Sequence, residues 1–258
     1  MTLPQRCNKF FKVLCTYYLF MKTLNKSEII QEEYYKKTAD SYNNSHCGNN
    51  DSEHDLALHQ LFGLIDFLEV KSILDVGSGT GRVISFFKNK NSAIKVIGIE
   101  PVKELRKVGY EQGISENDLI DGSGLGINFP DNSFDLVCEF GVLHHVKDNK
   151  KMVDEMLRVS KKAIFISDTN NFGSGSFVSR SLKQILNFLR LWNLFSFIRT
   201  KGKMYMISEG DGLFYSYSVF NNYSQIKKKC KSIHIFNTKD GSVNLYKTAS
   251  HISLLGIK

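Results

Sequence analysis

The chain has 258 residues, of which 42% are hydrophobic and 12% aromatic, so it can bury one sizeable core and is not a disordered protein. Its five cysteines are odd in number and form no Cys-x-x-Cys pair, which argues against a disulfide framework or a zinc cluster and indicates a reducing compartment. The net charge of +8 is uneven, because residues 41–150 hold 10 Lys and Arg against 16 Asp and Glu, whereas residues 151–258 hold 17 against 6. Such a basic third can face nucleic acid, an anionic membrane or a phosphorylated substrate, or it can be an ordinary solvated surface.

Residues 1–26 form an N-terminal extension of uncertain role. Its apolar run at 10–20 follows two cations, as in a signal peptide, but Lys12 interrupts the run and no small-residue cleavage site follows. The run is also too short to span a bilayer. It is compatible with an apolar helix packed on the domain or with a membrane-touching extension, and Met21 is an alternative start.

The next segment, from residue 27 to 45, is polar and rich in tyrosine, which is compatible with an exposed helix. Asparagines and a glycine over 43–52 indicate a loop. Ser52 can then cap a helix, because apolar residues up to Leu68 recur at roughly helical spacing.

Residues 73–83 predict a strand, a tight turn and the beginning of a helix. An apolar run with Asp75 near its end is typical of a buried parallel strand. Gly77, Gly79 and Gly81 let the backbone approach a ligand closely, and the N–H groups that open the next helix favour a negatively charged group. The third glycine comes one residue earlier than in a dinucleotide fingerprint, so an NAD-dependent oxidoreductase is only a distant alternative.

A second strand is predicted over 94–99, and Glu100 follows it directly. Glu100 lies 23 residues after Gly77, which is close to the spacing of a carboxylate that hydrogen-bonds a nucleotide ribose. Pro101 is predicted to start the next helix, because its fixed φ suits a first helical position.

A third motif lies at residues 127–146, where the chain reads Ile-Asn-Phe-Pro-Asp-Asn-Ser-Phe-Asp-Leu-Val-Cys-Glu-Phe-Gly-Val-Leu-His-His-Val. It predicts a turn at Pro130 and a strand over 134–140. Together with the glycine turn and Glu100, this motif resembles class I S-adenosylmethionine-dependent methyltransferases, in the broad group that includes ubiquinone and menaquinone C-methyltransferases. The resemblance covers residues 34–168, about half of the chain.

The resemblance implies S-adenosylmethionine as cofactor. In this family the glycine loop wraps the methionine end, an acid grips the ribose, and a tyrosine in an Ala-x-x-Tyr segment, here Tyr42, closes over the cofactor. Ser123 stands where the family usually places an acid or amide for adenine, with Asp121 as a substitute, and Glu139 would suit the cofactor's amino group. The implied cofactor-binding residues are Asp75, Gly77, Ser78, Gly79, Gly81, Glu100, Gly122, Ser123, Glu139 and Tyr42.

His144 is a candidate general base, because methylation of a hydroxyl requires removal of a proton and histidine titrates near neutral pH. The family often carries this pair, His144 and His145, as a structural linker instead. No group with metal-ligand spacing accompanies the pair, so no metal is expected.

Residues 169–218 are expected to shape the acceptor site as a helix and a loop. The segment 178–199 is broadly apolar with four cations, which is typical of an interfacial membrane helix or of a helix packed on the sheet and edged by snorkelling arginines. The segment 201–218 is predicted to be a loop, and long loops on such scaffolds tend to carry function, although it could be only a capping loop. Its candidates for a base or for substrate contacts are Glu209, Asp211, Tyr215 and Tyr217.

Further elements are predicted as helices over 148–160 and 220–230 and as strands over 163–167, 232–236 and 251–257. The fold class is therefore α/β, with a doubly wound, mostly parallel seven-stranded sheet that ends in an antiparallel hairpin, in one domain over 27–258. The expected function is methyl transfer to a small-molecule, sugar or lipid-linked acceptor in the cytoplasm, with peripheral contact to the anionic inner membrane surface. An RNA methyltransferase and a non-catalytic S-adenosylmethionine-binding protein are the alternatives.

Overall fold

The computed structural model describes residues 26–42, 52–239, 241 and 243–258. The N-terminal extension, with its alternative start at Met21, and most of the loop expected over 43–52 lie outside the described residues.

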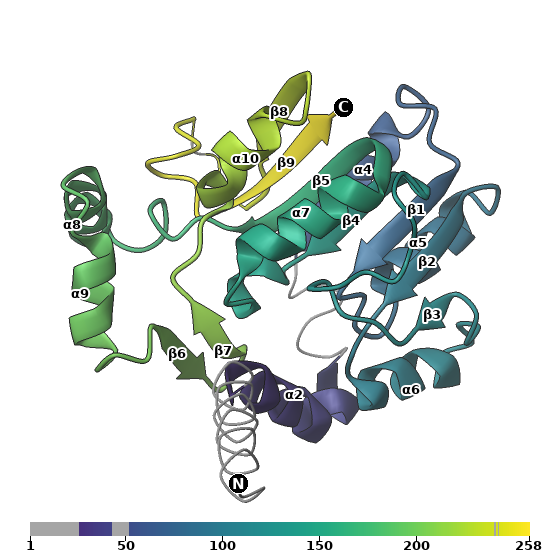
Figure 1. Cartoon of the computed structure of the whole chain (residues 1–258), viewed down its shortest axis with the longest axis horizontal. Helices are drawn as coiled ribbons and strands as arrows, with labels where there is room; N and C mark the ends of the chain where they lie inside the picture. Colours follow the sequence, from purple (N-terminus) through teal and green to yellow (C-terminus); the bar gives the residue numbers. More distant parts are fainter. Residues whose placement is uncertain (1–25, 43–51, 240, 242) are drawn as a thin grey trace, which may run out of the picture.

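A seven-stranded sheet forms the centre of the fold, in the order β3-β2-β1-β4-β5-β9-β8 (Figure 1). Its parallel part consists of β3 (Leu119–Ile120), β2 (Lys95–Ile99), β1 (Ser72–Val76), β4 (Phe134–Phe140) and β5 (Ser160–Thr169). β9 (His251–Ile257) runs antiparallel to β5 and to β8 (Ser232–Asn237). The predicted sheet, with its C-terminal antiparallel hairpin, is confirmed.

Both faces of the sheet are covered, because successive strand residues point to opposite sides. Leu74 belongs to the core under α7 (Asn149–Val159) and α10 (Tyr223–Lys227), whereas Ile73 belongs to the core under α4 (Ser52–Leu64) and α5 (Arg82–Lys90). The chain runs outward from β1 through β2 to β3 and then returns to β4 on the other side of β1. In doubly wound sheets, ligands bind at the carboxyl ends of the strands at such a reversal.

Several helices differ in detail from their predictions. α6 (Lys103–Glu111) follows Val102 as its N-cap, so the prediction that Pro101 starts this helix is wrong. The helix predicted over 220–230 consists of a 3-10 turn, η3 (Val219–Asn222), followed by the short α10. The tyrosine-rich segment forms α2 (Lys26–Thr38) and the 3-10 turn η1 (Ala39–Ser41).

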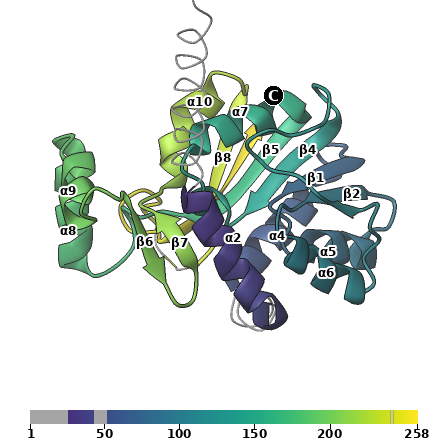
Figure 2. The same ribbon diagram turned by 60° about the horizontal axis from the view of Figure 1, so that its bottom comes forward.

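The helix predicted over 178–199 is two helices, α8 (Phe177–Phe188) and α9 (Trp192–Arg199). The break lies at Arg190, whose φ of 60° is incompatible with a right-handed helix. Both helices stand apart from the sheet in two views (Figures 1 and 2), and α8 has no buried residue, so the alternative of a helix packed on the sheet is wrong. Trp192 attaches α9 to the domain, because its ring packs on Phe172 and its Nε1 donates to Ser216 Oγ at 2.9 Å.

The segment predicted as a loop over 201–218 contains a β-hairpin, with β6 (Tyr205–Ser208) antiparallel to β7 (Gly212–Tyr215). β7 lies beside α2 and close to η2 (Leu143–His145), the turn that follows β4. The hairpin therefore brings residues from late in the chain to the carboxyl edge of the sheet. Within the described residues, no helix is long and apolar enough to cross a membrane.

Candidate active site

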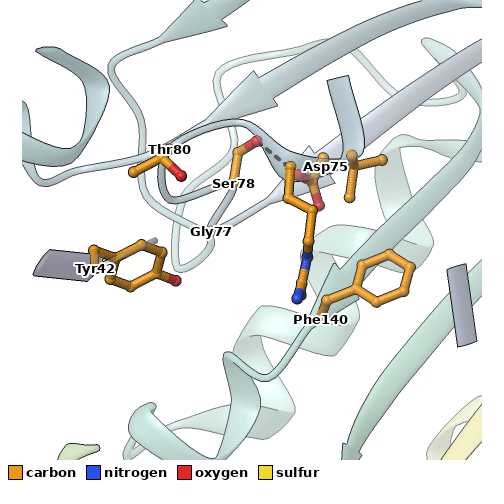
Figure 3. Close-up of a pocket in the computed structure, with 8 residues that line it drawn as sticks. Tyr42, Asp75, Gly77, Ser78, Thr80 and Phe140 are labelled. Carbon is orange, nitrogen blue, oxygen red and sulfur yellow. Dashed lines mark hydrogen bonds between the residues drawn. The ribbon is translucent and has the colours of Figure 1, made fainter. Parts of the chain in front are cut away.

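The glycine turn between β1 and α5 is fixed to the end of β2. The N–H groups of Gly77 and Ser78 donate to the carbonyl of Ile99 at 2.9 and 3.0 Å. Asp75 lies beneath the turn, where its Oδ2 accepts from Ser78 Oγ at 2.6 Å (Figure 3). Burial raises the pKa of Asp75 to about 6. These contacts give Asp75 a role in shaping the turn.

The turn is also packed too closely for larger residues. Gly77, Gly79 and Gly81 have φ of 74°, 57° and 86°, which residues with a Cβ rarely adopt. A Cβ on Gly77 would lie 2.6 Å from the side chain of Val142, and one on Gly79 would lie 3.0 Å from the hydroxyl of Tyr42. Tyr42 therefore faces the turn, as expected of a residue that closes over a ligand there.

Glu100 presents a fixed carboxylate beside this turn. Its Oε2 accepts from the N–H of Gly79 at 3.0 Å, and its Oε1 accepts from the N–H of Val102 at 2.9 Å. Burial raises the pKa of Glu100 to about 7. A carboxylate held in this way can accept the two hydroxyls of a ribose through its remaining lone pairs.

A first cavity, of about 280 Å³, opens over the turn. Gly77, Gly79 and Glu100 line it on one side, and apolar residues such as Val102 and Leu125 line it on another. Backbone without a Cβ, a carboxylate that can accept ribose hydroxyls, and apolar walls suited to a flat purine fit S-adenosylmethionine.

The expected adenine contacts are only partly assembled in this cavity. Ser123 lines the cavity, but Gly122 is not among its lining residues. Asp121 forms an ion pair with Arg106 at 2.7 Å and its side chain is 76% exposed, so it does not replace the usual adenine-binding acid. Ser123 is therefore the polar side chain available to adenine at this position.

Glu139 is fully buried and is not among the residues that line the cavity. Its Oε2 accepts from the N–H of Val142 at 2.8 Å, which fixes the loop after β4. Burial and the nearby charge of Asp168 raise its pKa well above the usual range. Glu139 thus supports the loop residue Val142, which lines the cavity, and does not line the cavity itself.

A second cavity, of about 320 Å³, adjoins the first. The two cavities share five lining residues, namely Tyr35, Tyr42, Phe140, Gly141 and His145. Four histidines and two carboxylates line the second cavity, namely His54, His144, His145, His251, Glu53 and Asp211. Burial lowers the pKa of His54 well below its usual range and that of His251 to about 4, so both are neutral at physiological pH.

His144 lies between two carboxylates. Its Nδ1 donates to Asp168 Oδ1 at 2.7 Å, and its Nε2 is 3.3 Å from Asp211 Oδ2. Although burial favours the neutral ring, Asp168 and Asp211 together raise the pKa of His144 to about 10. A ring that keeps its proton at neutral pH is a poor general base, so the geometry speaks against the role predicted for His144.

His145, unlike His144, is held as a neutral ring. Its Nδ1 donates to the carbonyl of Leu213 at 2.5 Å, which leaves Nε2 as an acceptor for the hydroxyl of Tyr35 at 3.1 Å. Burial, together with the charge of His144, lowers the pKa of His145. Its Nε2 also lies 3.4 Å from Asp211 Oδ1.

The two acids predicted in the hairpin turn, Glu209 and Asp211, have different surroundings. Asp211 reaches the histidine pair, and the two histidines lower its pKa against the effect of burial. Glu209 is exposed and is not among the residues that line the second cavity, and its backbone carbonyl accepts from the hydroxyl of Tyr34 at 2.7 Å. Tyr217 is buried and donates to Asn222 Oδ1 at 2.8 Å, which gives it a structural contact.

Several residues in and behind the second cavity carry no strong local sequence signal. His54 and His251 come from opposite ends of the domain and belong to no local motif. Asp168 could have been found, because it lies near the end of β5, as Glu100 follows β2, at the ligand-binding edge of the sheet. Asp211 was predicted, but not its contact with the histidine pair 66 residues earlier in the chain.

Comparisons with known proteins cover the cofactor half of this site. A family model described as a methyltransferase domain matches residues 74–166. Norajmaline N-methyltransferase of Rauvolfia serpentina is 33% identical over 94 residues, which are 35% of this chain and 32% of that protein. The uncharacterized methyltransferase YcgJ of Bacillus subtilis is 32% identical over 95 residues, 35% of this chain and 36% of that protein. The chain thus spans about a third of the length of these curated relatives.

Solved structures resemble the fold over more of the chain. An S-adenosylmethionine-dependent methyltransferase of Thermotoga maritima has a TM-score of 0.53 at 15% identity, covering 88% of this chain and 99% of that one. The PH0226 protein of Pyrococcus horikoshii has a TM-score of 0.55 at 14% identity, with the same coverage of 88% and 99%. At these identities the likeness concerns the fold alone, and the narrower resemblance to quinone methyltransferases stays a prediction. Residues 74–166 thus match a methyltransferase domain, and the fold around them is shared with a solved S-adenosylmethionine-dependent methyltransferase.

Proposed function

We propose that the protein transfers a methyl group from S-adenosylmethionine in the first cavity to a small polar acceptor, a sugar or a lipid-linked glycan in the second. The observation that carries this proposal is the shared wall of the two cavities, because a donor and an acceptor must meet there at van der Waals distance. When bound, S-adenosylmethionine supplies an activated methyl group on a sulfonium sulfur.

The chain's own residues chiefly align the two partners. Glu100 would hold the ribose hydroxyls, and the glycine turn would hold the methionine end. Tyr42 and Phe140 line both cavities, so their rings would exclude water from the transfer path. Displacement at a methyl carbon depends mainly on such alignment.

The second cavity favours a hydroxyl-rich acceptor. Imidazoles and carboxylates can both hydrogen-bond to hydroxyl groups. A volume of about 320 Å³ is at the small end of ligand sites, which suits one sugar ring better than a strand of nucleic acid.

Transfer of a tritiated methyl group into fractionated cell extract tests this function. We expect label in a small-molecule or glycolipid fraction that resists ribonuclease. Label that ribonuclease releases would support an RNA methyltransferase instead. Calorimetric binding of S-adenosylmethionine without label in any fraction would support the non-catalytic alternative.

We further propose that the protein works at the cytoplasmic side of an anionic membrane. The surface of α8 and α9, here the α8–α9 surface, exposes large apolar side chains. They are Phe177, Val178, Leu182, Ile185, Phe188, Leu189, Leu191, Leu194, Phe197 and Ile198. The segment from residue 172 to 208 also contains six Lys or Arg and no Asp or Glu.

An apolar face edged by cations matches the charge and hydrophobicity of an anionic lipid surface. The cytoplasmic leaflet carries this negative charge, and the free Cys138 and Cys230 suit the reducing cytoplasm. A membrane position would also bring the second cavity to lipid-linked acceptors. Sedimentation with anionic vesicles tests this contact.

A further inference from the structure

Three side chains of the second cavity converge on one point. The Nε2 atoms of His144 and His145 lie 3.3 and 3.4 Å from the two carboxylate oxygens of Asp211. One ligand atom from each of the three residues lies within 4.8 Å of the others. The two histidines belong to η2, whereas Asp211 comes from the turn of the β6–β7 hairpin.

The other nitrogen of each ring is already occupied. His144 Nδ1 donates to the buried carboxylate of Asp168 at 2.7 Å, and His145 Nδ1 donates to the carbonyl of Leu213 at 2.5 Å. Histidines that bind metals nearly always donate their second N–H to a carboxylate or to a backbone carbonyl, which fixes the tautomer and turns the ring. Both kinds of support are present here, one for each histidine.

A buried atom at this point lacks a partner. His144 is 8% exposed, and its Nε2 makes no hydrogen bond within the described residues, although Asp211 Oδ2 is 3.3 Å away. A buried polar atom without a hydrogen bond costs roughly 1–3 kcal/mol, so it calls for a ligand or another explanation. An ion held by the three side chains would replace the proton on this nitrogen, release that proton to solvent, and bond to the nitrogen instead.

We propose that His144, His145 and Asp211 bind one divalent first-row metal ion in the wall of the second cavity. Two imidazoles and a carboxylate are a donor set that suits Zn²⁺, Mn²⁺ or Fe²⁺ better than Ca²⁺ or Mg²⁺. Three protein ligands leave a coordination position open, and all three residues line the cavity.

Binding of the ion does not depend on the proposed methyl transfer, whereas its use does. An ion facing the second cavity would orient an acceptor hydroxyl and lower the pKa of that hydroxyl. The expectation of no metal rested on local spacing, and that spacing could not show Asp211 beside the histidine pair.

Equilibrium dialysis of the chelator-stripped full chain against Zn²⁺ and Mn²⁺, with elemental analysis, tests the site. We expect one ion per chain and at least a tenfold loss of affinity in Asp211→Asn. Glu209→Gln is the matched control, because it removes an exposed carboxylate from the same hairpin turn and should leave the affinity for the ion unchanged. Asp168→Asn, which weakens the support of the His144 ring, should weaken binding by roughly 10–100-fold.

A second readout keeps the test independent of catalysis and of folding. The visible spectrum of the Co²⁺-loaded wild-type chain should show ligand-field bands of a site with nitrogen and oxygen ligands, and His144→Gln should change them. Calorimetry with S-adenosylmethionine on each variant shows whether the first cavity is intact. Less than one ion per wild-type chain at 100 μM Zn²⁺ and Mn²⁺, or equal affinity in Asp211→Asn and Glu209→Gln, would overturn the proposal and leave the proposed function standing.

Discussion

At the scale of single residues, we expect Glu100 to link cofactor binding to protonation. In the cofactor-free protein this carboxyl holds its proton more tightly than an exposed carboxyl in water would, because burial raises its pKa to about 7. Ribose hydroxyls donate hydrogen bonds and therefore favour the ionised carboxylate. Binding of S-adenosylmethionine should consequently release the proton from Glu100.

We expect S-adenosylmethionine binding at pH 6 to release close to one proton, and at pH 9 almost none. The affinity should rise with pH up to about 7 and then level off. Calorimetry in two buffers with different ionisation enthalpies measures the released proton. Glu100→Gln should abolish the release and weaken binding by about 1–3 kcal/mol, since a charge-assisted hydrogen bond is lost. Proton release that persists in this variant would assign the proton to another group.

The same carboxyl affects the stability of the cofactor-free protein. Its folded pKa of about 7 exceeds the usual 4.5, so the folded state binds more protons than the unfolded state between these values. Its contribution to the free energy of unfolding is therefore largest at low pH and is lost as the pH rises from 4.5 to about 7. Urea unfolding at pH 4.5 and pH 7.5 should show a smaller loss in Glu100→Gln than in the wild type.

Gly77 tests how tightly the cofactor turn is packed. Gly77→Ala must adopt a φ of 74° and place its Cβ against the short, branched Val142. Gly113→Ala is the matched control, because Gly113 has a φ of 86° but nothing within 4 Å of its Cβ position. We expect the control to lose about 1–2 kcal/mol of stability and Gly77→Ala about 1–3 kcal/mol more, with weaker cofactor binding. Equal losses in thermal unfolding would show that Val142 moves aside without cost.

At the scale of elements, the β6–β7 hairpin is held against α2 by Gln31. Gln31 is buried, its Oε1 accepts from the N–H of Leu213 at 2.5 Å, and its Nε2 donates to the carbonyl of Asp211 at 3.2 Å. Gln31→Ala should cost about 1–3 kcal/mol, because it leaves the buried N–H of Leu213 without a partner. Hydrogen exchange should rise first in residues 205–215. Unchanged exchange there would mean that strand pairing alone places Asp211.

The elements that the sequence predicted well are those with a local cause. The buried strands over 73–76, 95–99 and 134–140 are apolar runs that end at turn residues. Glu100 could be placed beside the glycine turn because β1 and β2 are parallel neighbours whose carboxyl ends meet at one edge of the sheet. Its role toward a ribose stays a prediction.

The elements that the sequence missed depend on distant contacts. No glycine or proline marks the break at Arg190, so periodicity alone predicts one helix over 178–199. The turn Glu-Gly-Asp-Gly at 209–212 is a hairpin signal, but its strands are only four residues long and gain their support from α2. The second cavity combines side chains from α4, η2, the turn between β6 and β7, and β9 that no local pattern connects.

At the scale of the whole molecule, charge and apolar surface are divided between two ends. The cofactor half is acidic, whereas the α8–α9 surface combines exposed apolar side chains with cations. Both helices stand at one side of the domain (Figure 2), joined to it through the buried Trp192. A lipid surface could therefore cover α8 and α9 without covering the sheet.

We expect the protein to sediment with vesicles that contain anionic lipid, and much less with neutral vesicles or at high salt. Phe188→Ser, at a side chain that is 86% exposed, should weaken vesicle binding roughly tenfold. Phe67→Ser is the matched control, because Phe67 is 77% exposed in the turn that follows α4 and should not change vesicle binding. Arg190→Gln should weaken binding about fivefold, since each cation near an anionic surface contributes about 1 kcal/mol.

Two results would exclude the membrane contact and point to different partners. If the wild type ignores anionic vesicles at low salt but forms a dimer in sedimentation equilibrium that Phe188→Ser dissociates, a second copy of the chain covers the α8–α9 surface. If instead RNA binds, and Arg190→Gln lowers the slope of log affinity against log salt concentration by about one, the basic residues of 151–258 bind nucleic acid. The membrane contact is supported if Phe188→Ser and Arg190→Gln both weaken vesicle binding and Phe67→Ser does not. That pattern requires apolar insertion and positive charge on the same surface, and an anionic lipid surface accommodates both.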